Sequence, residues 1–110
     1  MAIYLLEQKT NGAGDCFKVA YQNMMKYGWD IGHAVVTRPT DGLQHVHAFN
    51  IVNEYIVIDF SNGRQNGCEK KEYFRLGKIK IFRIYNKRQA LEKAVETEHY
   101  GPWDPVFDNY

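Results

Sequence analysis

The stretch QHVHAFNIVNEYIVIDF, residues 44–60, decides the fold. It contains two runs rich in β-branched and aromatic residues, 44–51 and 55–60, and these runs are joined tightly at Asn53. The pattern predicts two antiparallel strands of one hairpin. Apolar residues occupy both sets of alternating positions, so the predicted sheet needs a covering layer on each of its faces.

Helical patterns on either side of this hairpin can supply the two layers. An early helix is predicted after Asp15, a good N-cap residue, and Gly28 can end it. A late helix is predicted after Asn86, and Gly101-Pro102 is expected to stop it. We therefore predict an α+β fold in which the N-terminal helix packs on one face of an antiparallel sheet and the C-terminal helix packs on the other face.

Shorter elements complete the predicted architecture. Strands are expected at 3–6, 33–38 and 79–85, and a short helix is expected at 70–76. The sequence shows no repeat and no linker, and its length suits one domain, so we expect a single domain over residues 1–110.

Charge and hydropathy narrow the possible partners. The chain has 14 Lys and Arg against 13 Asp and Glu, a formal net charge of +1, so it has no broad basic field and we expect no nucleic-acid partner. No apolar run approaches the ~20 residues that a membrane helix needs. The N-terminal apolar run is also too short for a signal peptide, so we expect a cytoplasmic protein without a membrane partner. The oligomeric state is left open.

Cys16 is the first candidate catalytic residue. It follows a glycine-rich loop at 10–14 and falls in the first turn of the predicted early helix. The helix dipole and the free backbone N–H groups at that end favour a thiolate over a thiol. The same N–H groups can face a developing oxyanion, so this position suits a nucleophile.

His47 and Asp59 are the candidates for a base and for its orienting carboxylate. A hairpin centred on Asn53 places His47 directly opposite Asp59, with Cβ atoms ~5 Å apart. In that register the carboxylate can hold the imidazole in one tautomer and stabilise its charged form. If the face that carries His47 meets the early helix, the imidazole points toward Cys16, and histidine titrates near neutral pH.

Three alternatives stay open at this point. His45 shares the face of His47 and is a rival base, although no carboxylate is expected opposite it. A metal site is a second alternative, but no familiar ligand spacing supports it. A disulfide between the two cysteines is the third, and a reducing compartment disfavours it. The disulfide would join Cys16 and Cys68. The candidate metal ligands are His33, His45, His47, Cys16 and Cys68.

Three segments resemble a known family: GDCFKVA at 14–20, HAF at 47–49 and VIDF at 57–60. They are similar to the Cys, His-Ala-aromatic and Asp series of transglutaminase-like domains in the papain-like superfamily, and the resemblance covers residues 12–63. The chain is also similar to small bacterial and phage proteins that close on GPWD, here at 101–104.

The resemblance implies that Cys16 is a nucleophile, His47 a base and Asp59 the residue that orients the base. It implies thiol-dependent acyl transfer on a protein or peptide amide, as in a cysteine peptidase, a deamidase or a transglutaminase, with no cofactor and no metal. The alternative is a catalytically inactive binding module on the same fold that engages a protein partner. The loop at 61–67 is expected to border the site. The further candidates for substrate or oxyanion contacts are Asn11, Phe17 and His45.

Overall fold

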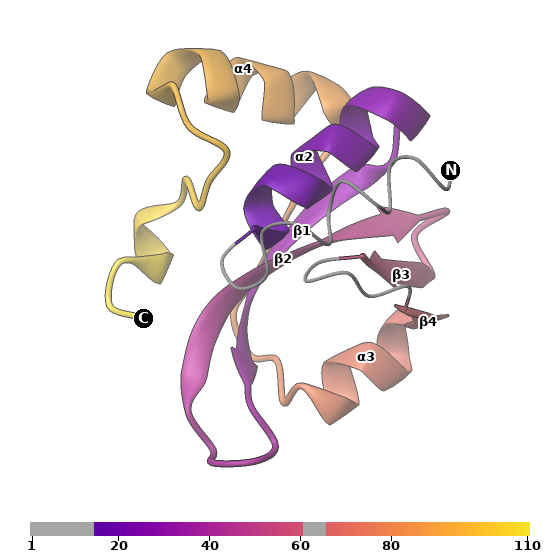
Figure 1. Ribbon diagram of the computed structural model, residues 1–110, viewed down its shortest axis with the longest axis vertical. Coiled ribbons are helices and arrows are strands. Elements are labelled where there is room, and N and C mark those ends of the chain that lie inside the picture. Colours follow the sequence, from indigo (N-terminus) through magenta and orange to yellow (C-terminus); the bar gives the residue numbers. More distant parts are fainter. Residues whose placement is uncertain (1–14, 61–65) are drawn as a thin grey trace.

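A five-stranded antiparallel sheet forms the centre of the fold in the computed structural model, which describes residues 15–60 and 66–110 (Figure 1). The strand order is β4-β3-β2-β1-β5, so the predicted hairpin lies in the middle of the sheet. The strands are β1 (Asp30–Thr37), β2 (Gln44–Val52), β3 (Ile56–Asp59), β4 (Asn66–Glu69) and β5 (Phe82–Tyr85). The α+β prediction is confirmed. The strand predicted at 3–6 lies outside the described residues.

In the described part of the chain three α-helices accompany the sheet, and all three were predicted. They are α2 (Cys16–Tyr27), α3 (Lys70–Leu76) and α4 (Lys87–Thr97), followed by a short 3-10 helix, η2 (Pro105–Phe107). The predicted caps hold in part. Gly28 ends α2 in a left-handed conformation (φ 74°), and Asn86 starts α4 with a capping box, whereas the side chain of Asp15 makes no capping hydrogen bond. α4 ends before Gly101, because Glu98 takes the left-handed cap position.

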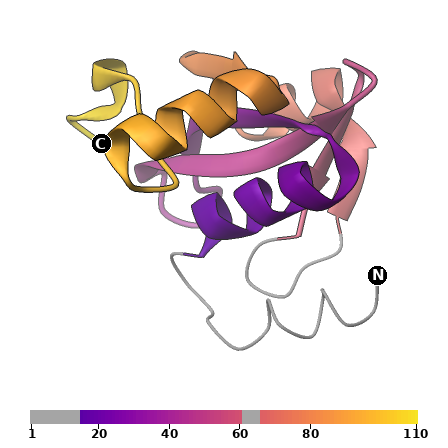
Figure 2. The ribbon, with the colours of Figure 1, turned by 90° about the horizontal axis from the view of Figure 1, so that it is seen from above.

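The placement of the C-terminal helix on the far face of the sheet was wrong. Ala90 of α4 shares one core cluster with Ala20 and Met24 of α2, so both helices cover the same face. Figure 2 shows α2 and α4 side by side. The opposite face is covered by α3, through Tyr73 and Phe74. A helical stripe shows that a helix is amphipathic, but it does not say which sheet face the helix covers.

Buried amides anchor α2 to the middle of the sheet. The Asn23 Nδ2 group donates to Asn50 Oδ1 at 3.0 Å, and Asn50 Nδ2 donates to the Ala20 carbonyl at 2.9 Å and to the Asp30 carbonyl at 3.2 Å. Both asparagines are fully buried. Hydrogen bonds between buried polar groups fix geometry, so this network sets where the first residue of α2 lies against the sheet.

The hairpin between β2 and β3 turns one residue later than predicted. Val52 pairs with Ile56, so the loop is 53–55 and is centred on Glu54. Asn53 and Glu54 both have positive φ, 53° and 68°. The predicted register, centred on Asn53, is therefore wrong by two residues, and position 59 is not directly opposite His47.

A shift of two residues keeps every side chain on its predicted face, because strand side chains alternate with a period of two. Asp59 thus remains on the face that carries His47, as a diagonal neighbour. The β2–β3 ladder ends at Asn50 and Ile58, and beyond that pair the two strands diverge (Figure 1).

The C-terminal segment packs back onto the domain. Trp103 and Phe107 lie against the ring of His33, with centroids at 5.0 and 6.3 Å. His33 is completely buried, and within the described part of the chain neither of its ring nitrogens has a hydrogen-bond partner. Burial therefore lowers the pKa of His33 to about 3, so the ring is neutral at physiological pH.

No helix in the described ranges is long and apolar enough to cross a membrane.

Candidate functional site

Cys16 is the first residue of α2 and is buried, with 7% of its surface exposed. The N–H groups in the first turn of a helix have no carbonyl partner within the helix, so they are donors for a nearby anion. The predicted position of Cys16 at a helix start is confirmed. Both cysteines are free thiols, so the disulfide alternative is not realised.

His47 and Asp59 are in direct contact although their register differs from the predicted one. The Nε2–H group of His47 donates to Asp59 Oδ2 at 2.8 Å, and both residues are buried. Diagonal neighbours on paired strands have Cβ atoms further apart than directly opposed residues, but the long histidine side chain spans this distance. The predicted partnership between this histidine and this carboxylate is therefore present.

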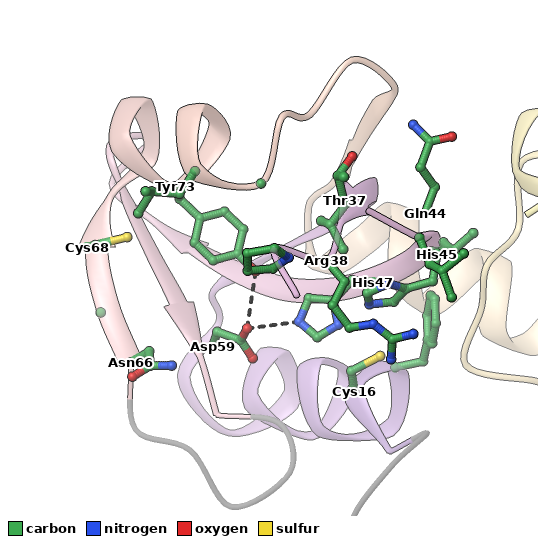
Figure 3. A pocket seen from close by; sticks show the side chains of 18 residues that line it. Cys16, Thr37, Arg38, Gln44, His45, His47, Asp59, Asn66, Cys68 and Tyr73 are labelled. Carbon is green, nitrogen blue, oxygen red and sulfur yellow. Dashed lines mark hydrogen bonds and ion pairs between the residues drawn. The ribbon is translucent and has the colours of Figure 1, made fainter. Parts of the chain in front are cut away.

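Cys16 and His47 approach each other from opposite faces of the sheet. His47 shares its face with Phe49 and α3, whereas α2 covers the other face. The sequence argument required α2 to cover the face that carries His47, and that condition is not met. The contact forms instead beside the place where β2 and β3 diverge, where the start of α2 brings Cys16 next to the His47 ring (Figure 3).

The electrostatics of the site centre on His47. Burial alone would lower the pKa of His47, but hydrogen bonds to Asp59 and to Cys16, together with the charge on Asp59, outweigh burial and raise this pKa to about 9. The imidazole is thus favoured in its protonated form near neutral pH. A protonated ring between a sulfur atom and a carboxylate can donate a hydrogen bond to each of them.

Tyr73 is a member of this cluster that sequence reasoning missed. Its hydroxyl group donates to Asp59 Oδ2 at 3.1 Å, the same oxygen that accepts from His47. The Tyr73 ring also packs on Phe49, with centroids 4.8 Å apart. The short helix at 70–76 was predicted, but a helical pattern carries no information about which strand residue a tyrosine hydroxyl will meet.

A groove of about 950 Å³ opens onto these residues. Its walls come from the start of α2, the β1–β2 hairpin, β3, β4 and the second half of α3. Figure 3 shows Cys16, His47 and Asp59 along this groove, with Asn66 and Cys68 toward one end and Gln44 and His45 toward the other. A ligand in the groove can therefore lie across the thiol with space on both sides.

The remaining predicted residues fall in different places. Phe17 and His45 line the groove, and the His45 ring lies edge-on to His47 with centroids 5.9 Å apart. Asn11 lies outside the described residues. Asn66 and Gly67, predicted as part of a loop at 61–67, instead begin β4 and line the groove.

Neither rival role for the histidines gains support. Asp59, the carboxylate predicted to orient the base, contacts His47. His33 lies on the sheet face away from His45 and His47, and its ring is enclosed by aromatic side chains. In the described ranges no three His, Cys, Asp or Glu side chains gather as a metal site.

Comparisons with protein-family models, with curated proteins and with solved structures give no match for this chain. The functional argument therefore rests on the geometry and chemistry of the site.

Proposed function

We propose that the protein performs thiol-dependent acyl transfer on an amide, with Cys16 as nucleophile, His47 as base and Asp59 as the residue that orients His47. The observation that supports this most directly is the His47 ring, which binds Asp59 through Nε2 at 2.8 Å and interacts with the Cys16 thiol. The proposed fold is a minimal papain-like or transglutaminase-like core, in which the nucleophile begins a helix and the base lies on a strand of an antiparallel sheet.

The proposed reaction has two halves. Since Nε2 of His47 is bound to Asp59, Nδ1 is the ring nitrogen that holds the proton released by the Cys16 thiol. The Cys16 sulfur then forms a bond to the carbonyl carbon, and the N–H groups at the start of α2 face the oxyanion. The C–N bond breaks, His47 gives its proton to the leaving amine, and a thioester remains on Cys16.

The thioester is resolved by a second nucleophile. Water or an amine attacks the thioester carbon while His47 accepts its proton, and the C–S bond breaks to return the thiol. Water as acceptor gives a peptidase or a deamidase, and an amine gives a transglutaminase. Each half requires a reduced Cys16, so we propose that the protein works in a reducing compartment such as the cytoplasm.

Alkylation with iodoacetamide near pH 6.5 tests the activated thiol. An ordinary cysteine is only about 1% ionised at that pH, and burial together with nearby carboxylates raises the pKa of Cys68 further. Peptide mapping should show Cys16 modified at least about tenfold faster than Cys68. His47→Gln should remove this preference, whereas His45→Gln, a change at the neighbouring histidine, should leave it intact.

Acyl transfer itself is tested with p-nitrophenyl acetate, which leaves an acetyl thioester on a reactive cysteine. Mass spectrometry should locate the acetyl group on Cys16, and Cys16→Ser should abolish it while changing stability by no more than about 1 kcal/mol. Equal alkylation of both cysteines, unchanged by His47→Gln, would contradict the proposal. That outcome would favour a binding module without catalytic activity.

A further inference from the structure

The groove that holds Cys16 carries positive charge at the end formed by the β1–β2 hairpin. Arg38 and His45 line this end. Asp59 is the only carboxylate among the described lining residues, and it already accepts hydrogen bonds from His47 and from Tyr73. An anionic group that enters the groove beside the hairpin therefore meets the Arg38 guanidinium group and no unpaired carboxylate.

The backbone of Arg38 is fixed by the hairpin. Its N–H group donates to the Leu43 carbonyl at 2.8 Å, and its own carbonyl accepts from Gly42 N–H at 2.8 Å. Figure 3 shows the Arg38 side chain extending into the groove toward Cys16. The guanidinium group is thus carried by a defined turn and points toward the thiol.

The guanidinium group keeps donors for a ligand. Its Nε and Nη2 atoms donate to Asp41 at 3.0 and 2.7 Å, and within the described ranges its Nη1 atom has no partner. Asp41 does not line the groove. The two side chains are 51% and 42% exposed, and an exposed ion pair of this kind is weak, so a ligand carboxylate can share or replace it.

We propose that Arg38 forms a carboxylate-binding subsite, so that the substrate of Cys16 carries a carboxylate close to its reacting carbonyl. The planar guanidinium fork matches a carboxylate with two parallel hydrogen bonds, and a lysine would not provide that match. Leu43 and Leu76 also line the groove and are more than half exposed, so apolar parts of the same substrate have surface to cover. The inference rests on the proposed role of Cys16 as the nucleophile.

The test compares two alkylating reagents that differ in charge. Iodoacetate is an anion and iodoacetamide is neutral, and both form an S–CH₂ bond to the Cys16 sulfur with loss of iodide. The ratio of the two rate constants cancels the intrinsic reactivity of the thiol. The ratio reports how strongly the surroundings of Cys16 favour a reagent that carries a carboxylate over a neutral one.

Arg38→Gln should lower the ratio of the iodoacetate rate to the iodoacetamide rate by about threefold, the effect of a unit charge ~6 Å away in a water-like dielectric. Asp41→Asn should raise the ratio, because it removes the charge that neutralises Arg38 while its amide oxygen can still accept from the Leu43 N–H. Arg75→Gln is the matched control, since Arg75 forms a similar exposed pair with Glu72 and does not line the groove. It should leave the ratio unchanged.

The outcomes separate the two proposals. A ratio that is the same in the wild-type protein, Arg38→Gln and Asp41→Asn, with Cys16 still rapidly alkylated by iodoacetamide, overturns the subsite and leaves the nucleophile intact. Slow alkylation of Cys16 by both reagents overturns the proposed function. An equal fall in the ratio for Arg38→Gln and Arg75→Gln also overturns the subsite, because it would reflect net charge alone.

Competition against alkylation identifies the source of the carboxylate. Acetyl-Gly-Gly carries a chain-terminal carboxylate, acetyl-Asp-Gly-amide carries a side-chain carboxylate, and acetyl-Gly-Gly-amide carries neither. Slower alkylation with the first or the second peptide, lost in Arg38→Gln, supports a chain terminus or an acidic side chain respectively. Equal slowing by all three peptides would contradict carboxylate recognition.

Discussion

The protein should become less stable as the pH rises, because the stabilising contact between protonated His47 and Asp59 is then lost. The pKa of His47 is about 9 in the folded protein, against 6.5 for an unperturbed histidine. The folded state therefore holds a proton that the unfolded chain has already released. This contribution to stability is complete below pH 6.5 and is lost as the pH rises through about 9.

The size of the effect follows from the same two values. One pKa unit corresponds to ~1.4 kcal/mol, so the interval between 6.5 and about 9 corresponds to about 3 kcal/mol of unfolding free energy. The side chains of His47 and Asp59 are only 10% and 4% exposed, so solvent screens the pair little. A loss of this size is a large part of the stability of a small domain.

Urea unfolding of the wild-type protein and of Asp59→Asn, over a range from about pH 6 to about pH 10, measures this loss. The variant removes the carboxylate and leaves burial opposed only by Cys16, so the pKa of His47 should fall. Its alkaline loss of stability should therefore be smaller than that of the wild-type protein. The difference between the two curves cancels shared groups that do not contact His47, such as the carboxylates of the exposed ion pairs.

NMR titration of the His47 ring gives the same quantity directly, with the signal assigned by its absence in His47→Gln. A midpoint near 9 in the wild-type protein and a lower midpoint in Asp59→Asn are expected. A wild-type midpoint at or below 6.5, or parallel stability curves for the two proteins, would refute the reasoning.

Three further changes test other parts of the structure. Tyr73→Phe keeps the packed ring but removes the hydroxyl donor to Asp59, so alkylation of Cys16 should slow severalfold while unfolding free energy changes by only about 1 kcal/mol. An equal loss of stability and reactivity would mean that the hydroxyl has only a structural role. His33→Phe should make the protein less sensitive to acid. Because the pKa of His33 is lowered to about 3, the unfolding free energy of the wild-type protein should fall by up to about 4 kcal/mol between pH 6.5 and pH 3. The unfolding free energy of the variant should fall much less over the same range. Asn50→Ala leaves buried amide partners on α2 without their hydrogen bonds and should cost roughly 3 kcal/mol in urea unfolding, and a cost below about 1 kcal/mol would show that the network does not hold α2.

The sequence was sufficient to predict the central hairpin, the three helices of the described residues and the contact between His47 and Asp59, but not the register of the hairpin. Both Asn53 and Glu54 adopt positive φ, and glutamate has no particular preference for that conformation, so the position of the turn left no clear signal. The pairing of His47 with Asp59 survived because the error was two residues. An error of one residue would have moved Asp59 to the other face of the sheet.

The sequence did not predict which helix covers which face of the sheet, and the reason is different. The apolar stripe of α4 and the apolar positions of the strands are both visible in the sequence, yet nothing local links one stripe to one face. α4 joins α2 through the buried cluster that contains Ala90 and Met24, and the formation of such a cluster is a matter of tertiary packing. The same limit applies to Tyr73, whose hydroxyl finds Asp59 only once α3 has docked.

The approach of Cys16 and His47 from opposite faces of the sheet has a consequence for how the protein folds. Neither layer alone can assemble the pair: docking α2 delivers the sulfur, and ordering β2 and β3 under α3 delivers the imidazole. A compact intermediate that kept its helices but had loose side-chain packing would hold both residues apart. Rapid alkylation of Cys16 should therefore return during refolding only with the last cooperative step. The alkylation rate of this thiol then reports when native packing is complete.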